Sequence, residues 1–518
     1  MFLSLLFLRK PPFSTYLPGD TYYFDQILDH FNSTNNKTFK QRYFYNDTFC
    51  QNTSKQKLIV FIGGESTLTE RRVQKGAYMK LAKDTNSCVV ALEHRYFGQS
   101  QPFELLTTEN LTYLTSDQAL ADLAYFIESF IKIKFTTRPT ILVVGGSYPG
   151  TLSSYFRLKY PHIADFSWAS SPPLYVKNDF WEYDAHCAAV LRNINYQCLE
   201  NTRKIYEDFN DHPKSIADYI QFKPSVSHVS QLSILSDFIA GIVQYDNNYK
   251  LVRPYCQEQS GKSPNYNAFQ EYFKKYLDIE QVQDPSDLDD FALTNHSIYT
   301  DYADSLSWTW MTCNEFGWFQ TASGKLRPAK VDLNYSDLVC RTYFGIGISS
   351  DINNNRSAKM DIYNAQNPAS TMIYFSNGNT DPWSVLSVSD NIENPLLGRY
   401  SVKINNASHC SDLGEHADTE PKELTTARKQ ILDTMTRWLN HPEGPNCSEH
   451  GRRFLDGCIC ERGYEGTECR NKEIKIVLFK VFYSLVVLLP TLMMIIIGCS
   501  AWFLFKKDGE DTEIKTIP

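Results

Sequence analysis

The chain has 518 residues, of which 42% are hydrophobic and 14% aromatic, and its formal net charge is -8 at pH 7. This length predicts several domains, or one large domain with insertions. The negative charge argues against a nucleic-acid-binding surface, so we expect no nucleic-acid partner. The aromatic content favours large packed cores or clefts lined by aromatic rings.

Both the cysteines and the glycosylation sequons predict a protein of the secretory pathway. Residues 1–19 contain a short apolar run, Phe2–Leu8, which Arg9 and Lys10 follow, and we interpret them as a short signal region. Twelve of the 13 cysteines lie outside the apolar C-terminal segment, an even set that favours disulfides. Ten Asn-x-Ser/Thr sequons point to the same compartment. We predict glycosylation at eight of them: Asn32, Asn36, Asn46, Asn52, Asn110, Asn295, Asn334 and Asn355.

Residues 20–170 predict the first part of an α/β core. Apolar runs at Leu58–Ile62, Cys88–Leu92 and Phe166–Ser170 are typical of buried strands. Asp117–Ile131 carries apolar residues at helical spacing. Strands that alternate with helices favour a mostly parallel sheet covered on both faces.

Ser147 stands between the apolar run Ile141–Val144 and a helical stretch, within Gly145–Gly150 (GGSYPG). A strand, a sharp glycine turn and a helix with serine at the apex form a nucleophile elbow. Such a turn lifts Oγ clear of the sheet, and the N–H of Tyr148 can then point at a developing oxyanion. Pro149 replaces the usual glycine, which is tolerable in the first turn of a helix. Taken alone, the stretch is also compatible with an ordinary glycine turn.

Residues 171–330 break the alternation and read as a mainly helical cap insertion over the active site. The core resumes in residues 331–441, with strands at Thr371–Ser376 and Ser401–Asn405. Asp381 follows the first of these strands, and His409 follows the second. The order Ser147, Asp381, His409 is that of α/β-hydrolases, in which the histidine takes the serine proton and the acid orients the histidine.

The C-terminal end predicts a membrane anchor. Val481–Phe505 has no charged residue and is long enough to span a bilayer. Lys506 and Lys507 follow, so the tail 506–518 is expected in the cytoplasm and the body in the lumen or outside the cell. This arrangement describes a single-pass type I membrane protein. A buried core helix is the alternative.

Residues 446–470 resemble the end of an EGF-like module, with four cysteines instead of six. The resemblance implies the bonds Cys447–Cys458 and Cys460–Cys469. So small a segment has too little core to fold without such bonds. A stalk is the expected role, and partner binding is the alternative.

The body resembles the S28 serine peptidase family, which includes Pro-X carboxypeptidase, dipeptidyl peptidase II and a thymus-specific branch. The resemblance implies an α/β-hydrolase core with a helical cap, and hydrolysis near a peptide terminus, often after proline. Met311 and Cys410 depart from the family pattern, since glutamine and, in two branches, histidine are usual there. The resemblance to the family rests on the elbow, on the triad segments and on seven further stretches. These are Phe24–Phe31, Gln41–Phe44, Gly63–Glu65, Glu93–Gly98, Gln118–Leu123, Lys159–Pro161 and Trp308–Gly317.

The remaining candidate residues lie near the triad in the expected fold. Gly64 or Glu65 follows an early strand whose loop commonly supplies the second oxyanion N–H; a plain turn is the alternative. Glu65 is also a candidate for binding a substrate's amino terminus, which would make the enzyme an aminodipeptidase. His94 is a rival base by residue type, but an exposed loop with Arg95 beside it favours a structural role. Trp308, Trp310 and Trp383 are candidates for an apolar pocket or for core positions.

These inferences combine into one functional prediction. We expect a membrane-anchored serine exopeptidase that prefers proline at the cleaved bond and works through an acyl-enzyme without a cofactor. Peptides are the expected substrates, and a homodimer is the candidate oligomer. No cysteine or histidine spacing indicates a metal site. A catalytically silent adhesion or receptor protein on a hydrolase fold, and an esterase with the same triad, remain as alternatives.

Overall fold

A computed structural model gives the structure of the chain. The residues it describes are 21–50, 56–212, 220, 222–280, 296–300, 302–348, 359–388, 390–444, 446–461, 464–466, 468–472, 492–497 and 499–502. They form two compact units. Unit 1 comprises Met1–Asn394 with Gly398–Pro442, and unit 2 comprises Pro395–Leu397 with Glu443–Pro518.

Unit 1 is built on a nine-stranded sheet of order β1-β2-β4-β3-β5-β6-β9-β11-β10 within the described residues. The pairs β1–β2, β2–β4 and β10–β11 are antiparallel, and the other neighbours are parallel, as the sequence predicts. The strands are β1 (Tyr22–Ile27), β2 (Thr38–Asn46), β3 (Lys57–Ile62), β4 (Cys88–Leu92), β5 (Thr140–Gly146), β6 (Phe166–Ser170), β9 (Ile373–Gly378), β10 (Ile392–Asn394) and β11 (Arg399–Ile404).

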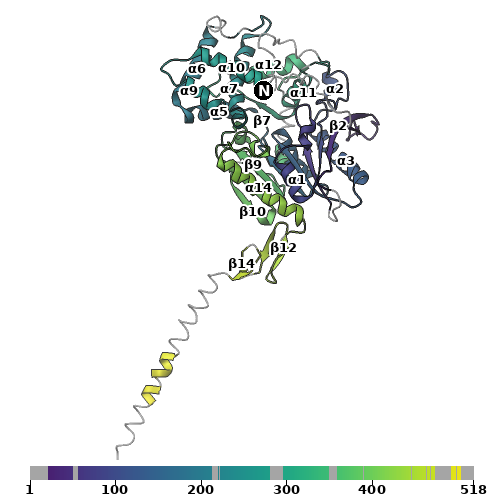
Figure 1. Ribbon diagram of the computed structural model, residues 1–518, viewed down its shortest axis with the longest axis vertical. Helices are drawn as coiled ribbons and strands as arrows, with labels where there is room; N and C mark the ends of the chain where they lie inside the picture. The colour runs from purple at the N-terminus through teal and green to yellow at the C-terminus, as the bar shows by residue number, and fades with distance from the viewer. Residues whose placement is uncertain are drawn as a thin grey trace, which may run out of the picture. The chain divides into compact units, whose positions relative to one another are not determined.

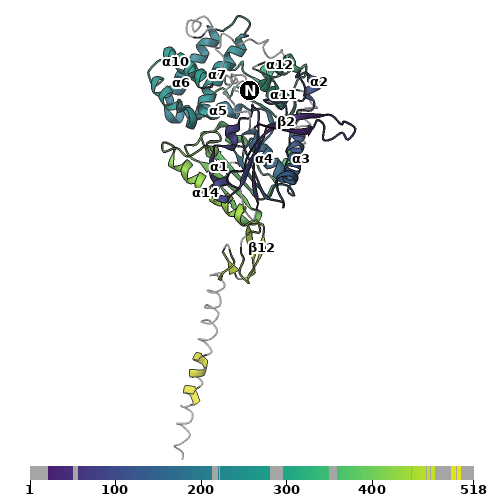
Figure 2. The same cartoon turned by 45° about the vertical axis from the view of Figure 1, so that its right-hand side comes forward.

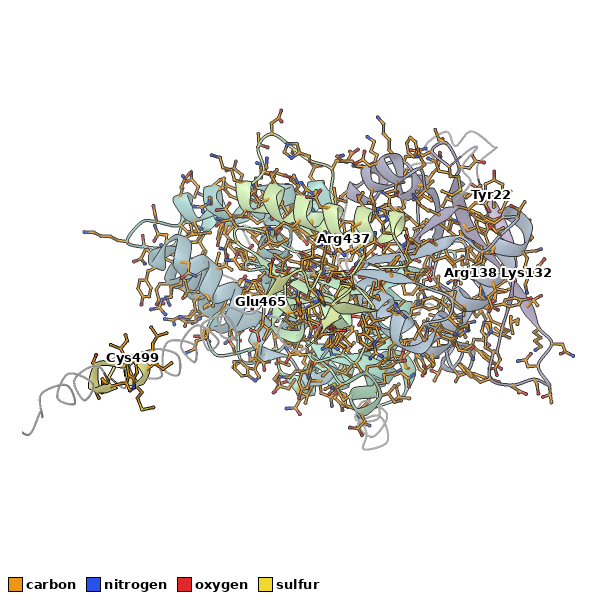
Figure 3. The ribbon with its side chains drawn as sticks, turned by 90° about the horizontal axis from the view of Figure 1, so that it is seen from below. Tyr22, Lys132, Arg138, Arg437, Glu465 and Cys499 are labelled. Atoms are coloured by element: carbon orange, nitrogen blue, oxygen red, sulfur yellow. A yellow bond between two sulfur atoms is a disulfide. The ribbon has the colours of Figure 1, made fainter. Side chains whose placement is uncertain are left out.

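Helices cover both faces of this sheet (Figure 2). Side chains along a strand point to alternate faces, so Ile59 and Phe61 of β3 pack on one side and Leu58 and Val60 on the other. The first side is covered by α1 (Ala77–Thr85) and α14 (Lys422–Asn440), and the second by α3 (Ser116–Lys134) and α4 (Tyr148–Lys159). Side chains fill these layers in Figure 3, where Arg437 marks α14 and Lys132 marks α3. Burial on both faces explains why the central strands are continuous apolar runs.

The chain leaves the sheet after β6 and returns at β9, and the segment between them is mainly helical (Figure 1). The sheet resumes at Ile373, so the predicted boundary at residue 331 precedes α12, which still belongs to this insertion. A short parallel pair, β7 (Lys177–Asp179) with β8 (Gly317–Phe319), lies within it. Its helices include α5 (Trp181–Ile194), α6 (Tyr196–Asp211), α7 (His228–Gln244), α8 (Asp246–Tyr249), α9 (Val252–Glu258), α10 (Tyr266–Glu280), α11 (Ala303–Met311) and α12 (Leu333–Phe344). The predicted α/β-hydrolase core with a helical insertion is therefore confirmed.

Three disulfides lie in unit 1: Cys50–Cys88, Cys198–Cys256 and Cys313–Cys340. The last two lie within the insertion. Cys187, buried on α5, and Cys410 carry free thiols. The even set of twelve cysteines is thus not fully paired in the structure.

Unit 2 contains two small hairpins, β12 (Gly451–Phe454) with β13 (Gly457–Cys460), and β14 (Tyr464–Glu465) with β15 (Asn471–Lys472). Cys447 is bonded to Cys458 and Cys460 to Cys469, the same pairs that the EGF-like resemblance implies.

The terminal segments fall largely outside the described part of the chain. Among the described residues, no helix has both the length and the apolar character needed to cross a membrane. Most of the predicted span 481–505, the signal region 1–19 and the tail 506–518 lie outside the described residues.

The structure describes five of the eight predicted glycosylation sites. Asn32, Asn36 and Asn334 are exposed. Asn46 and Asn110 are half-buried, and their side-chain amides donate hydrogen bonds to the main-chain oxygens of Val73 and Leu105. Glycosylation at these two positions would leave one amide hydrogen on each Nδ2 for the existing hydrogen bond. The sites at Asn52, Asn295 and Asn355 lie outside the described residues.

Replacing Trp438 of α14 tests the packing of the first sheet face. Trp438 is 1% exposed and stacks on Phe166 of β6 at a ring-centroid distance of 5.2 Å. Because the cavity would open in a closed layer, Trp438→Ala should lower the free energy of unfolding by about 3–5 kcal/mol. Denaturant titration of the full chain measures this. Lys429→Ala on the exposed face of the same helix should change it by no more than about 0.5 kcal/mol; equal effects would contradict the packing account.

Candidate active site

Ser147 occupies the turn between β5 and α4 in a strained backbone conformation, with φ 64° and ψ -134°. Non-glycine residues with positive φ cost on the order of 1–3 kcal/mol and persist only where the surroundings hold them. Here the N–H of Ser147 donates to Ser170 O at 2.9 Å, and its carbonyl accepts from the N–H of Thr151 at 3.1 Å. A Cβ on Gly145 would collide with the Pro149 carbonyl. The sharp turn therefore needs glycine at that position, as a nucleophile elbow does.

Asp381 and His409 form a buried pair. His409 Nδ1 lies 2.8 Å from Asp381 Oδ2, while Asp381 Oδ1 accepts the N–H of Trp383 at 2.9 Å. The two residues are 0% and 2% exposed. Burial alone would lower the pKa of His409, but the neighbouring charge of Asp381 outweighs it, and the pKa is raised well above its ordinary value. Asp381 thus orients the imidazole and stabilises its protonated form.

The histidine segment lies against the serine turn. A Cβ on Gly146 would be 3.0 Å from Cys410 Sγ, and the N–H of Cys410 donates to Ser171 Oγ at 3.0 Å. The strands β5, β9 and β11 belong to the parallel part of the sheet, so their carboxyl ends meet at one edge. The structure therefore brings the segments of Ser147, Asp381 and His409 to the same edge. His409 Nε2, on the far side of the ring from Asp381, is buried and has no hydrogen-bond partner among the described residues.

A buried carboxylate that the sequence analysis missed, Asp412, accepts hydrogen bonds from strand residues at this edge of the sheet. Asp412 is 2% exposed and accepts hydrogen bonds from Ser170 Oγ at 2.5 Å, Ser376 Oγ at 2.6 Å and Trp168 Nε1 at 3.1 Å. A buried charge needs such partners. Asp412 ties β6, β9 and the histidine loop together. Its position three residues after the histidine is the signal that could have drawn attention to it.

The loop after β3 packs against the elbow. A Cβ on Gly64 would lie 2.5 Å from Pro149 Cγ, so Gly64 and the elbow helix are in direct contact. Glu65 is half-buried; burial raises the pKa of its carboxyl, while its own main-chain N–H, His409 and Arg72 oppose that shift. The main-chain N–H groups of this loop are therefore near the turn that carries Ser147.

Tyr148 and His94 form a second hydrogen-bonded pair behind the elbow. The Tyr148 hydroxyl lies 2.9 Å from His94 Nε2, and His94 Nδ1 lies 2.7 Å from the main-chain oxygen of Arg95. His94 is 4% exposed, so the expectation of an exposed loop was wrong. Burial lowers the pKa of His94 to about 4. Both ring nitrogens have partners, which fits a structural residue.

Two of the three candidate tryptophans lie near the triad. The rings of Trp308 and Tyr148 are 5.4 Å apart, and those of Trp383 and His409 are 6.4 Å apart. Both tryptophans also contact Trp318, which the sequence analysis missed although it directly follows the family segment that ends at Gly317.

Trp310 lies apart from this cluster. Its ring packs on Phe344 at 5.4 Å, and its Nε1 donates to Leu114 O at 3.2 Å. The structure thus brings Trp308 and Trp383 together and separates Trp310 from them. No group of three or more histidine, cysteine or acidic side chains within the described ranges could hold a metal ion.

Comparison with known proteins points to one family. The family model described as serine carboxypeptidase S28 matches residues 26–431. Mouse thymus-specific serine protease is 28% identical over 452 residues, covering 80% of this chain and 86% of that protein. Mouse lysosomal Pro-X carboxypeptidase is 26% identical over 462 residues, covering 80% and 88%. Among solved structures, proline iminopeptidase of Mycobacterium smegmatis aligns with a TM-score of 0.38 at 11% identity, over 81% of this chain and 98% of that one.

Asp381→Asn should change how stability depends on pH. The folded-state pKa of His409 lies above its ordinary value of 6.5. The pair therefore stabilises the fold fully below pH 6.5, and this contribution is lost as the pH rises through the raised pKa. Denaturant unfolding across that window should show a decline in the wild type that Asp381→Asn lacks. Asp433→Asn, in an exposed pair with Lys429, should follow the wild type; parallel curves for all three proteins would contradict the assignment.

Proposed function

Because the chain belongs to the S28 family and is a serine-type carboxypeptidase of that family, we propose that Ser147, His409 and Asp381 are its catalytic triad. The observation that carries this proposal is the combination of a strained serine elbow with a buried Asp–His pair whose Nε2 has no partner among the described residues. A strained serine turn costs free energy and persists where the surroundings hold it, and strongly shifted pKa values such as that of His409 cluster at functional sites.

The proposed reaction follows from these positions. Ser147 Oγ attacks the scissile carbonyl while His409 Nε2 takes its proton, and Asp381 stabilises the imidazolium that forms. The N–H of Tyr148, with that of Gly64 or Glu65, would stabilise the oxyanion. His409 then gives its proton to the leaving amine. Water next attacks the acyl-enzyme while His409 takes a proton from it, and His409 returns that proton to Ser147 Oγ as the acid product leaves.

We further propose that proline is preferred at the cleaved bond. Trp308, Trp318 and Trp383 form a buried aromatic cluster beside Tyr148 and His409, and an apolar aromatic wall at this place would suit the compact ring of proline. The name of the related mouse Pro-X carboxypeptidase supports this choice.

The proposed cellular setting is the secretory pathway, with the body held at a membrane by residues 481–505 above an EGF-like stalk. Five disulfides among the described residues support an oxidising compartment. The length and apolar character of 481–505 support the anchor. The two disulfides of unit 2 support the stalk.

Ser147→Ala in the full chain tests the nucleophile. Wild-type protein should react with a fluorophosphonate probe, and the variant should not. Peptide hydrolysis should fall on the order of 10⁶-fold, because the covalent route is removed. Ser260→Ala, at an exposed serine outside the site, is the matched control.

Product masses from a panel of proline-containing peptides define the activity. Loss of one C-terminal residue supports the proposal, whereas release of an N-terminal dipeptide would favour the aminodipeptidase alternative. Hydrolysis of esters alone would favour the esterase. If well-folded wild-type protein does not react with the fluorophosphonate probe, the proposed peptidase activity is contradicted. The adhesion or receptor protein would then be the favoured alternative.

Trp383→Leu and Trp310→Leu form a matched pair for the proline pocket. Both residues are buried tryptophans, but Trp383 lies beside His409 and Trp310 lies apart. The ratio of kcat/KM for proline to alanine at the cleaved bond should fall about tenfold in Trp383→Leu, because an apolar wall is lost. It should stay near the wild-type ratio in Trp310→Leu. An equal fall for both substrates in Trp383→Leu would argue against a role in selectivity.

A further inference from the structure

Cys410 presents a thiol at the edge of the serine turn. Its backbone is held in the left-handed region, with φ 53°, and its N–H donates to Ser171 Oγ at 3.0 Å. Its Sγ lies 3.8 Å from Ser170 O, and a Cβ on Gly146 would be 3.0 Å from that sulfur. The residue as a whole is half-buried. The loop thus holds the thiol of a half-buried cysteine against Gly146, the residue that precedes Ser147.

A second feature lies on His409, the residue that directly precedes Cys410 in the chain. The side chain of His409 is 1% exposed, and its Nε2 is buried with no hydrogen-bond partner among the described residues. Nδ1 is engaged by Asp381, so Nε2 faces away from that carboxylate. Burial lowers the pKa of His409, and the charges of Asp381 and then Cys410 raise it. Because Cys410 directly follows His409, the thiol and the imidazole belong to the same loop.

The other free thiols differ in their surroundings. Cys187 on α5 is 1% exposed, and burial raises the pKa of its thiol, which keeps it protonated and unreactive. Cys499 is exposed but belongs to unit 2. Within the described residues of unit 1, Cys410 is thus the free cysteine that is not fully buried.

We propose that Cys410 is a modification site at which a small disulfide, such as oxidised glutathione or cystine, reversibly blocks the peptidase. The block, though not the modification itself, rests on the proposed roles of Ser147 and His409. In the reaction, the Cys410 thiol loses its proton and its sulfur attacks one sulfur of the small disulfide. That S–S bond breaks, Cys410 forms a mixed disulfide with one half, and the other half leaves as a thiolate that takes up the proton. Cys410 is oxidised and the released thiol is the reduced product.

Crowding around the sulfur explains why an adduct would block catalysis. A Cβ on Gly146 would also lie 2.6 Å from Leu413 Cδ1, so there is no room for added atoms between the thiol and the elbow. The adduct would extend away from Gly146 and Leu413, and we place it over the side chains of Ser147 and His409. It would then occupy the space where the substrate has to approach, and its polar groups would be available to His409 Nε2. A small thiol that removes the adduct would restore access.

The test uses the full-length protein in mild detergent, with Cys499→Ser introduced to remove the exposed thiol of unit 2. We expect oxidised glutathione to add one glutathione to the peptide that contains Cys410 and none to the peptide that contains Cys187. Fluorophosphonate labelling of Ser147 and peptide hydrolysis should both fall about 10²-fold, because the substrate can no longer take its position. Reduced glutathione should restore both. Cys410→Ser, compared with its own untreated rate, should be insensitive.

The mass of the Cys410 peptide tests the modification, whereas fluorophosphonate labelling and peptide hydrolysis test the proposed peptidase activity. An unmodified Cys410 thiol after treatment would overturn the inference, as would a complete adduct that leaves labelling and hydrolysis intact. Loss of activity in Cys410→Ser equal to that of the treated parent would also overturn it. If the untreated protein neither labels nor hydrolyses peptides, the proposed function fails, whereas an adduct found on Cys410 by mass alone still supports the modification site.

Discussion

The strained turn at Ser147 is the constraint around which unit 1 is arranged. A serine with φ 64° is tolerated because hydrogen bonds to Ser170 and Thr151 fix its two peptide groups. The strand β6, which supplies Ser170, is in turn held by the buried carboxylate of Asp412. Asp412 lies three residues after His409, so the same side chain that holds β6 beside the elbow also anchors the loop that carries the proposed base. Hydrogen bonds therefore connect the serine elbow to the histidine loop through β6 and Asp412.

The helical insertion contributes hydrogen bonds to the segments of the candidate site. Gln244, at the end of α7, accepts the N–H of His409 through its main-chain oxygen at 2.9 Å. Its side-chain oxygen accepts Nε1 of Trp383 at 2.9 Å and the hydroxyl of Tyr183 at 2.6 Å. His186 on α5 contacts the main-chain oxygen of Asn379, two residues before Asp381. Movements of the insertion would therefore reach both the acid and the histidine.

Several charged residues in the segments that resemble the S28 family stabilise the fold through buried ion pairs. Glu93 is 0% exposed and pairs with Arg42, and it also accepts the N–H of Leu68 at 2.9 Å. Arg95 is equally buried and donates two hydrogen bonds to Asp122 of α3. Buried charges of this kind must be paired, because an unpaired charge in the interior is very costly. These pairs hold the strand ends and the first helices in place, and the proposed catalytic residues lie on the same sheet.

The sequence by itself determined the elements and the identity of the triad candidates. Apolar runs and helical spacing located β3, β4, β5, β6 and α3, because local hydrophobic periodicity depends on neighbours a few residues apart. The glycine turn at Ser147 and the placement of Asp381 and His409 after strands are likewise local patterns.

Tertiary structure alone decided which residues surround those three. Trp318 joins Trp308 and Trp383, Trp310 faces another direction, and Cys410 rests on Gly146. These contacts link segments far apart in the chain, and a side chain's direction depends on how whole elements pack, which no short stretch of sequence specifies. The same reason explains why the burial of His94 and the pairing state of Cys187 became evident only in the folded chain.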